Sequence, residues 1–449
     1  MKELGSPFGI IISDKIIEEE KIDNIKYILR LKIILVFILL AIVLYSLVFF
    51  EFTRIDLFNL LKLFIRKLKL INIKNKFGVI LILFLCFLIM PNIIYRIFYK
   101  NFDHTNYENR TLASKPIFMS TNINEYPKKY EEYFNDYLPF RNELVKLKNL
   151  NDIFVFKNII SDIVLLGKAK WLFTKEVNLT EKYIGIEKYN FTEKELEKAK
   201  NNLIHFRDEL KKKNIDFIFM VCPDKQFIYS ECMPDYIKRK STKNGTDIFV
   251  EYIKDNTDIK VVYPKEELLK YKDKYQLYYK YDAHWNTLGA YIEYTQLMKS
   301  FGIYIDNIDN VDIKDFDGNQ SYNFLGVYQY NDMAYLLSLN SLKYYNDDKT
   351  YIISNYITKN YYVKDGFLYN SKAYSNENNI MMIKDSFSLN MIDYIATEFK
   401  QSEFILTYSF RNEDILKYKP DIVVFETVER VLKQICLYKI KEINNDLED

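Results

Sequence analysis

The stretch Ile380-Met381-Met382-Ile383-Lys384-Asp385-Ser386 joins an unbroken apolar run to three polar residues. The apolar run predicts a strand that is buried on both faces. Met391, Ile395 and Phe399 follow at the spacing of one helix face. A buried strand that leads directly into a helix is the repeating unit of a parallel α/β sheet. We therefore expect Ser386 at a strand-to-helix turn.

Other segments favour the same architecture. Residues 215–222 and 259–263 are further apolar runs, each with a proline at its end, and residues 192–213 carry apolar side chains at helical spacing. A second helix is expected after Asn286, a candidate N-cap. Strands separated by helices predict an α/β fold, with a parallel sheet covered by helices. The Tyr-rich residues 306–374 are expected to form an insertion with β-hairpins.

The segment Tyr281-Asp282-Ala283-His284-Trp285-Asn286 holds one of three histidines and one of two tryptophans in the 449 residues. Asp282 and His284 are two positions apart, so an extended backbone points both side chains to one side. A carboxylate that holds an imidazole fixes its tautomer and stabilises its protonated form. A general base needs both when it removes the proton of a serine hydroxyl. We therefore predict that Asp282, His284 and Ser386 act together.

A structural alternative stays open for these residues. Asp385 or Ser386 is a common type of helix cap, and a helix start needs no catalytic reason for either. If Ser386 is instead a nucleophile, the free N–H groups of the same helix start can hold an oxyanion. The other histidines do not compete, because His205 lies on the amphipathic helix and His104 follows the apolar N-terminal region.

Composition excludes several classes of function. The chain has 63 basic and 61 acidic residues, a net charge of +2, and so lacks the overall charge of a nucleic-acid-binding protein. Its four cysteines have no metal-binding spacing, so no metal is expected, and Cys222 with Cys232 is either a disulfide or a pair of thiols. Because no glycine-rich nucleotide loop is present, we expect no cofactor.

The first hundred residues predict a membrane module. Residues 33–50 and 77–95 are uncharged and almost wholly apolar, and each is close to the ~20 residues that span a bilayer. Residues 51–76 between them carry seven Lys and Arg, which predicts a cytoplasmic loop and an extracytoplasmic domain over 101–449. The side of the charged tail 1–32 stays open. An uncleaved signal sequence is the alternative for the first apolar segment.

Motifs in a fixed order carry a resemblance to a known family. They are Glu108-Asn109-Arg110, Asp136-Tyr137-Leu138-Pro139-Phe140-Arg141, Gly167 with Trp171-Leu172-Phe173, Pro223-Asp224-Lys225, Asp282 to Asn286 with Leu288-Gly289-Ala290-Tyr291, Lys384-Asp385-Ser386-Phe387, and Pro420-Asp421-Ile422-Val423-Val424 with Glu426 and Glu429-Arg430. Over about residues 108–432 the chain resembles the SGNH-hydrolase-like domain of the alginate O-acetyltransferase family. It also resembles the related proteins named after a DHHW motif.

The resemblance implies an acyl-transfer site that O-acetylates an exported polysaccharide outside the cytoplasmic membrane. Ser386 would be the nucleophile, His284 the base and Asp282 the residue that orients it. Asn286, Lys384 and Trp285 are the candidates for the oxyanion hole or for substrate binding. Lys384 departs from the family, since many members have glycine there. A multispanning membrane acyltransferase is the expected source of acetyl groups.

Two other functions stay open at this point. A deacetylase or esterase would use the same three residues with water as the acceptor. A non-catalytic cell-surface scaffold or glycan-binding protein would use them only as ordinary polar residues. The distance between His284 and Ser386 distinguishes these alternatives: a large distance would favour the scaffold over either enzyme.

Overall fold

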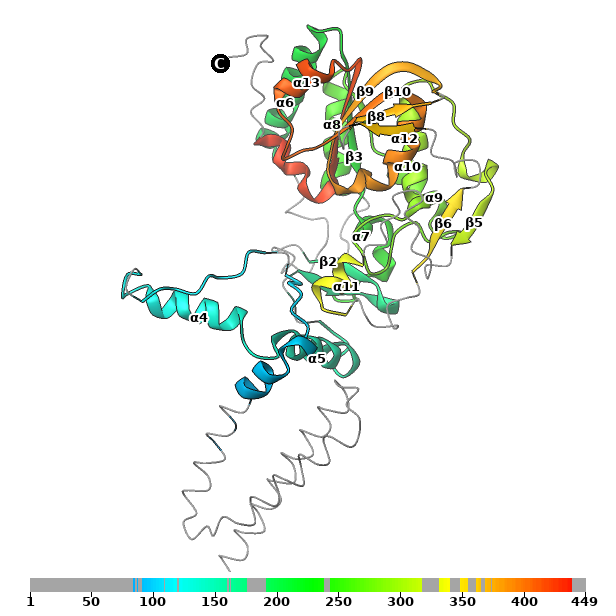
Figure 1. Ribbon diagram of the computed structural model, residues 1–449. Coiled ribbons are helices and arrows are strands. Elements are labelled where there is room, and N and C mark those ends of the chain that lie inside the picture. The colour runs from blue at the N-terminus through cyan, green and yellow to red at the C-terminus, as the bar shows by residue number, and fades with distance from the viewer. Residues whose placement is uncertain are drawn as a thin grey trace, which may run out of the picture. The chain divides into compact units, whose positions relative to one another are not determined.

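The computed structural model describes residues 84, 87, 91–108, 110–118, 121–159, 161, 163–175, 191–237, 243–316, 331–339, 348–353, 361–364, 368–372 and 374–437 (Figure 1). The tail 1–32, the segment 33–50, the loop 51–76 and most of 77–95 lie outside these residues. Within the described residues, no helix is both long and apolar enough to cross a bilayer. The two transmembrane helices therefore stay a prediction.

The chain divides into two compact units. One comprises the residues up to Asp103 together with Tyr137–Glu143, and the other comprises His104–Asp136 and Leu144–Asp449. In the first unit the rings of Tyr95 and Phe102 stack at 5.2 Å, and Phe140 packs edge-on against Phe102 at 4.8 Å. All candidate site residues belong to the second unit.

A seven-stranded sheet forms the centre of the second unit. Its strand order is β4-β3-β11-β9-β10-β8-β7. Neighbours from β4 to β10 pair in parallel, whereas β8 pairs antiparallel with β10 and β7 antiparallel with β8. The strands are β3 (Asp216–Cys222), β4 (Lys260–Val262), β7 (Tyr361–Lys364), β8 (Leu368–Ser371), β9 (Asn376–Lys384), β10 (Phe399–Leu406) and β11 (Ile422–Val428).

A parallel sheet was predicted, and the observed sheet is mixed, so this prediction is confirmed only in part. The buried apolar runs form β3, β11 and the second half of β9, which lie at the centre of the five parallel strands, and strands buried on both faces are typical of parallel pairing. The predicted insertion contributes β7 and β8, a hairpin that extends the edge of the same sheet. A second antiparallel pair joins β5 (Ile313–Phe316) to β6 (Thr350–Ile353).

Helices cover both faces of the sheet (Figure 1). One apolar layer holds Ile218, Met220 and Cys222 of β3, and the other holds Phe217, Phe219 and Val221, as alternation along a strand requires. On the first face lie α7 (Lys225–Ile228), α9 (Lys265–Tyr271), α10 (Thr287–Ser300), η7 (Ser386–Met391) and α12 (Ile392–Glu398). On the second lie α6 (Glu193–Lys211), α8 (Gly245–Asn256), α13 (Asn412–Tyr418) and η8 (Glu429–Cys436).

Local sequence explains where these helices begin. Thr192 and Glu195 form a reciprocal capping box at the start of α6, and Asn286 caps α10 as predicted. A hairpin also precedes α6, with β1 (Val164–Leu166) paired antiparallel with β2 (Leu172–Thr174). Cys222 and Cys232 are free thiols, so the disulfide alternative is not realised.

The remaining described elements are short or lie outside the sheet. They are η1 (Tyr99–Asn101), α4 (Tyr126–Asp136), α5 (Arg141–Phe154), η2 (Lys168–Lys170), η3 (Ser230–Cys232), η4 (Ile308–Asn310) and α11 (Asp332–Leu336). Of these, α11 belongs to a small apolar cluster with Leu172, Tyr281 and Ala283. This cluster supports the loop that carries His284.

Candidate active site

Three chain segments leave the carboxyl edge of the parallel sheet and supply the candidate site. Asp385 and Ser386 follow β9, Asp224 and Lys225 follow β3, and Glu429 follows β11. The ends of parallel strands meet at one edge, and ligands of open α/β sheets bind beyond that edge. Residues far apart in sequence are therefore brought together here by the pairing of β3, β11 and β9.

A narrow loop, residues 277–286, brings His284 to this edge. Its two arms are joined by an isolated bridge between Tyr278 and Trp285 and by the hydrogen bond from the N–H of Asn286 to the carbonyl of Leu277, 2.9 Å. Gly289 lets the loop lie directly on α10. A Cβ at this position would come within 2.4 Å of the carbonyl oxygen of Leu277, so any other residue would displace the loop.

Asp282, His284 and Ser386 form one hydrogen-bonded line. Nδ1 of His284 lies 2.6 Å from Oδ1 of Asp282, and Nε2 lies 2.8 Å from Oγ of Ser386. The Asp282 side chain is fully buried, the imidazole is 15% exposed, and Ser386 is exposed. With the proton on Nδ1, the imidazole donates to Asp282 and Nε2 can accept the serine proton.

Backbone groups fix Asp282 in this orientation. Oδ1 also accepts the N–H of His284 at 2.9 Å, and Oδ2 accepts the N–H of Asp332 at 3.0 Å. Asp332 also binds the histidine loop through its side chain, whose Oδ1 accepts the N–H of Ala283 at 2.9 Å. Its other oxygen lies 3.9 Å from Nδ1 of His284. The imidazole therefore faces two carboxylates, of which only Asp282 is directly bonded to the ring.

These carboxylates change the acidity of the imidazole. Burial lowers the pKa of His284, but the hydrogen bond to Asp282 and the charges of Asp282 and Asp332 outweigh it, so the pKa is raised above the ordinary value. Burial, with the nearby charge of Asp282, raises the pKa of Asp332 to about 6. The pocket thus favours a proton on the imidazole, as expected for a base that receives one.

The turn that carries Ser386 is held from the opposite side by Glu426. Oε2 of Glu426 accepts the N–H of Asp385 at 2.8 Å and the hydroxyl of Ser388 at 2.7 Å, and Oε1 lies 3.0 Å from the thiol of Cys222. Glu426 is fully buried, and burial, with the charge of Asp385, raises its pKa to about 8. The hydroxyl of Ser388 is thus buried and hydrogen-bonded to Glu426, two residues from the exposed Ser386.

Asp385, and not Ser386, caps the helix that follows. Its Oδ1 accepts the N–H of Phe387 at 2.8 Å, while Oδ2 accepts the N–H of Val428 at 2.7 Å. The capping alternative therefore applies to Asp385 and leaves the hydroxyl of Ser386 to His284. Among the described residues, none accepts the backbone N–H of Ser386.

Lys225 stabilises the histidine loop from inside. Its ammonium donates to the carbonyls of Tyr279, Lys280 and Asp282 at 3.0, 3.2 and 2.6 Å. Burial lowers the pKa of Lys225 to about 8, although neighbouring carboxylates oppose the shift. The motif Pro223-Asp224-Lys225 was part of the family resemblance, but no role was predicted for its lysine.

Arg430 lies beside the turn that carries Ser386. Its guanidinium is 4.9 Å from the centre of the Phe387 ring and pairs with Asp224. The Phe387 ring is in turn 4.8 Å from the imidazole of His284. Arg430 thus brings a fixed positive charge near the site, and sequence spacing alone gave no reason to single it out.

Three predicted binding residues are placed differently from expectation. Both amide hydrogens of Asn286 go to backbone carbonyls, those of Gln276 and Lys349, and its oxygen caps α10, so this side chain has no donor left for an oxyanion. Trp285 is fully buried and packs edge-on against Phe387 at 5.1 Å. Lys384 is 3% exposed and donates to the carbonyl of Asp385.

One group of described residues has the composition of a metal site. Ligand atoms of Asp282, His284 and Asp332 lie within 4.8 Å of one another. Nδ1 of His284 and Oδ1 of Asp282 are already joined at 2.6 Å, so an ion would have to replace this hydrogen bond. The arrangement fits an oriented base better than a metal ligand set.

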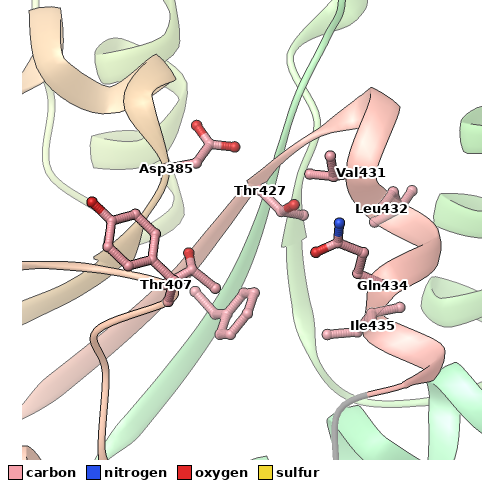
Figure 2. A pocket seen from close by; sticks show the side chains of 9 residues that line it. Asp385, Thr407, Thr427, Val431, Leu432, Gln434 and Ile435 are labelled. Carbon is pink, nitrogen blue, oxygen red and sulfur yellow. The ribbon is translucent and has the colours of Figure 1, made fainter. Parts of the chain in front are cut away.

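A hollow of about 190 Å³ adjoins the turn that carries Ser386 (Figure 2). Asp385 and Thr407 line one side, Thr427 lies between, and residues of η8 form the other side. The hollow therefore opens at the carboxyl edge, next to the residue that precedes Ser386.

Comparisons with known proteins find matches among solved structures and one family model. Among solved structures, the chain is similar to PatB1 of Bacillus cereus, with 18% identity, 61% of this chain and 97% of that chain covered, and a TM-score of 0.42. It is similar to a DHHW family protein from Eubacterium siraeum, with 12% identity, 63% and 97% coverage, and a TM-score of 0.43. The O-acetyltransferase domain of Pseudomonas putida AlgJ gives 13% identity, 64% and 96% coverage, and a TM-score of 0.37.

None of these neighbours assigns a role to a residue of this chain at such identities. No curated protein sequence matches the chain. A family model does match it: residues 164–318 fit the SGNH hydrolase-like domain of the acetyltransferase AlgX, and this confirms the resemblance predicted from the motifs.

Proposed function

We propose that this protein is an O-acetyltransferase that moves an acetyl group through Ser386 to a hydroxyl of a cell-surface or exported polysaccharide. The observation that carries the proposal is the hydrogen-bonded line from Asp282 through His284 to Ser386, at 2.6 and 2.8 Å. These distances lie within the reach that a general base needs. The scaffold alternative loses its main support, since it expected His284 far from Ser386.

The first half of the reaction forms an acetyl-serine. Oγ of Ser386 attacks the acetyl carbonyl carbon while its proton passes to Nε2 of His284. The tetrahedral intermediate collapses, the bond to the donor oxygen breaks, and His284 returns the proton to that leaving oxygen. Asp282 stabilises the imidazolium in between. The backbone N–H of Ser386 is the candidate donor to the oxyanion, because Asn286 has none to offer.

The second half transfers the acetyl group. A sugar hydroxyl gives its proton to His284 and attacks the acetyl-serine carbonyl. The ester bond to Ser386 breaks, and Oγ recovers a proton from His284. Water in place of the sugar would make the protein an esterase, so the identity of the acceptor decides between transferase and esterase. The expected donor is a multispanning membrane acyltransferase, and the expected location is the outer side of the cytoplasmic membrane.

The acetyl content of the polymer distinguishes the three functions. Cell-surface polysaccharide is extracted from cells that carry wild-type protein, Ser386→Ala or Ser388→Ala, and ester-linked acetate per sugar is measured. A transferase predicts less acetate in Ser386→Ala and a nearly normal amount in Ser388→Ala. More acetate in Ser386→Ala would indicate a deacetylase, and an unchanged amount would favour the scaffold.

A further inference from the structure

The hollow beside the nucleophile turn has the properties of a binding site. It lies between the end of β9, the residues that follow β10, and η8, all at the carboxyl edge of the sheet (Figure 2). Ligands of open α/β sheets bind at this edge. Asp385, which lines the hollow, is bonded through its backbone to Ser386. The hollow therefore borders the turn that carries the attacking hydroxyl.

The lining combines an apolar wall with hydrogen-bonding groups. Phe425, Leu432 and Ile435 form the wall. The hydroxyl of Thr427 has only a 3.5 Å contact, with the carbonyl of Val428. Within the part of the chain that the structure describes, the amide of Gln434 has no hydrogen-bond partner. An apolar wall with a few convergent polar groups is typical of a small-molecule site.

An exposed aromatic ring completes the hollow. Tyr408 is among the lining residues and is 85% exposed. A flat ring beside groups that donate and accept hydrogen bonds suits a molecule with apolar C–H faces and a rim of hydroxyls. A pyranose ring has this character. The hollow, with a volume of about 190 Å³, suits one such ring.

The charge of the lining residues indicates which class of sugar the hollow can bind. Its residues include one carboxylate, that of Asp385, and neither lysine nor arginine occurs among those the structure describes there. Both oxygens of Asp385 are bonded to backbone N–H groups and hold the turn. A uronic acid would bring a second carboxylate with no cation in the lining to receive it. A neutral sugar has no such cost.

We propose that this hollow is the acceptor subsite and that it binds a neutral sugar unit of the polysaccharide, with the ring against Tyr408 and hydroxyls on Gln434 and Thr427. The inference rests on the proposed function and adds the class of sugar and the residues that select it. It separates the residues that bind the acceptor from Ser386, His284 and Asp282, which act on every acetyl ester.

The test compares two activities in four variants of the full-length protein, Tyr408→Ala, Gln434→Ala, Tyr304→Ala and Ser386→Ala. Tyr304 is the matched control, because it is 80% exposed and lies outside the lining. One measurement is ester-linked acetate on the polysaccharide of cells that carry each variant. The other is hydrolysis of p-nitrophenyl acetate by the purified protein, which needs no sugar.

We expect Tyr408→Ala and Gln434→Ala to lower polymer acetate about tenfold, the scale of one lost substrate contact. Their p-nitrophenyl acetate hydrolysis should stay within about twofold of wild type, and Tyr304→Ala should change neither activity. Fragments of the wild-type polymer should carry the acetyl groups on neutral hexose or N-acetylhexosamine units.

Other results overturn the subsite. Normal polymer acetate in Tyr408→Ala and Gln434→Ala would contradict it, as would an equal loss of ester hydrolysis, which would mean that these residues support the fold. Acetyl groups on uronic acid units would contradict the class of sugar. If Ser386→Ala also leaves polymer acetate unchanged, the proposed function itself fails, and this outcome is distinct from failure of the subsite alone.

Discussion

The turn after β9 presents two very different environments within three residues. On the His284 side, formed by Ser386, His284 and Asp282, an exposed hydroxyl meets an imidazole. On the Glu426 side, formed by Asp385, Ser388 and Glu426, a buried hydroxyl and a backbone N–H meet a carboxyl group. The same type of side chain is therefore available for chemistry in one place and part of the structure in the other.

The comparison teaches that accessibility and partner, rather than residue type, decide which serine can react. Ser386 faces a base whose pKa is raised by Asp282 despite burial. Ser388 faces Glu426, whose pKa burial raises to about 8, so at neutral pH that carboxyl is largely protonated and a poor base. Substitutions on the His284 side should therefore lower the reaction rate directly. Substitutions on the Glu426 side should lower the stability of the fold and displace the turn that carries Ser386.

The largest effect is expected on the His284 side. Asp282→Asn and His284→Ala should each lower kcat/KM for p-nitrophenyl acetate by about 10⁴, as the equivalent change does in a serine protease. The double variant should be little worse than either single one, because the two act as one unit. Additive losses in steady-state kinetics would instead indicate two independent roles.

Asp282→Asn should also affect stability. The carboxylate accepts backbone N–H groups of His284 and Asp332, and an amide oxygen can replace only one of these acceptors. Leaving a buried donor unpaired costs about 1 to 3 kcal/mol. The thermal midpoint should therefore be lower than that of His284→Ala, and the reverse order would show that the Asp332 contact has little energetic weight.

A smaller effect should follow from changes to Glu426. Glu426→Ala removes the acceptor for Asp385 and Ser388 and should lower kcat by about 10², the scale of a nucleophile displaced by about 1 Å. Glu426→Gln resembles the protonated carboxyl and should keep most of the activity. Equal losses in both variants would show that the negative charge, and not the hydrogen bonds, matters.

Glu426 should also make stability depend on pH. Its folded pKa of about 8 lies above the ordinary glutamate value of about 4.3, so the folded state holds a proton that the unfolded state releases. This contribution is complete below about pH 4.3 and is lost as pH rises through about 8. Denaturation from pH 5 to 9 should show a flatter decline in Glu426→Gln than in wild type; parallel curves would contradict the shift.

The pH dependence of activity should report His284. Only the neutral imidazole accepts the serine proton, and its raised pKa places the acid limb of kcat/KM above about pH 6.5, the ordinary histidine value. Asp282→Asn removes the main cause of the raised His284 pKa. The acid limb of the remaining activity should therefore move to lower pH. A limb that stays in place would mean that another group controls it.

The smallest effect is expected for Ser388→Ala. It leaves Glu426 with one donor fewer in a buried site, so a stability loss of about 1 kcal/mol is expected. Activity should stay within about threefold of wild type, because the Asp385 contact still holds the turn. A much larger rate loss would mean that the two sides of the turn are not separable.

The sequence predicted much of this site because its elements are local. The apolar run before Asp385 defines β9, the i, i+2 spacing of Asp282 and His284 anticipates their contact, and Asn286 is a good N-cap. Each of these follows from a few neighbouring residues. The mixed edge of the sheet could not be foreseen, because strand partners such as β8 and β10 are set by long-range packing.

The same limit explains the site residues that were misjudged or missed. The polar side chain of Asn286 was a predicted oxyanion donor, but its amide donates to the carbonyls of Gln276 and Lys349. Lys225 and Glu426 gave the opposite error. Both belonged to quoted motifs, yet their roles depend on distant partners. Lys225 donates to carbonyls 54 or more positions away, and Glu426 accepts a hydroxyl and an N–H group that lie 38 and 41 positions away.

Covalent acylation of Ser386 is the most direct test of the account. The full-length protein is mixed with p-nitrophenyl acetate, quenched in acid and digested, and the peptide containing Lys384-Asp385-Ser386-Phe387 is analysed by mass spectrometry. We predict one added acetyl group on Ser386 in wild type and in Ser388→Ala, and none in Ser386→Ala, whose thermal midpoint stays near wild type. An adduct on Ser388, or turnover and an adduct that persist in Ser386→Ala, would contradict the assignment of the nucleophile.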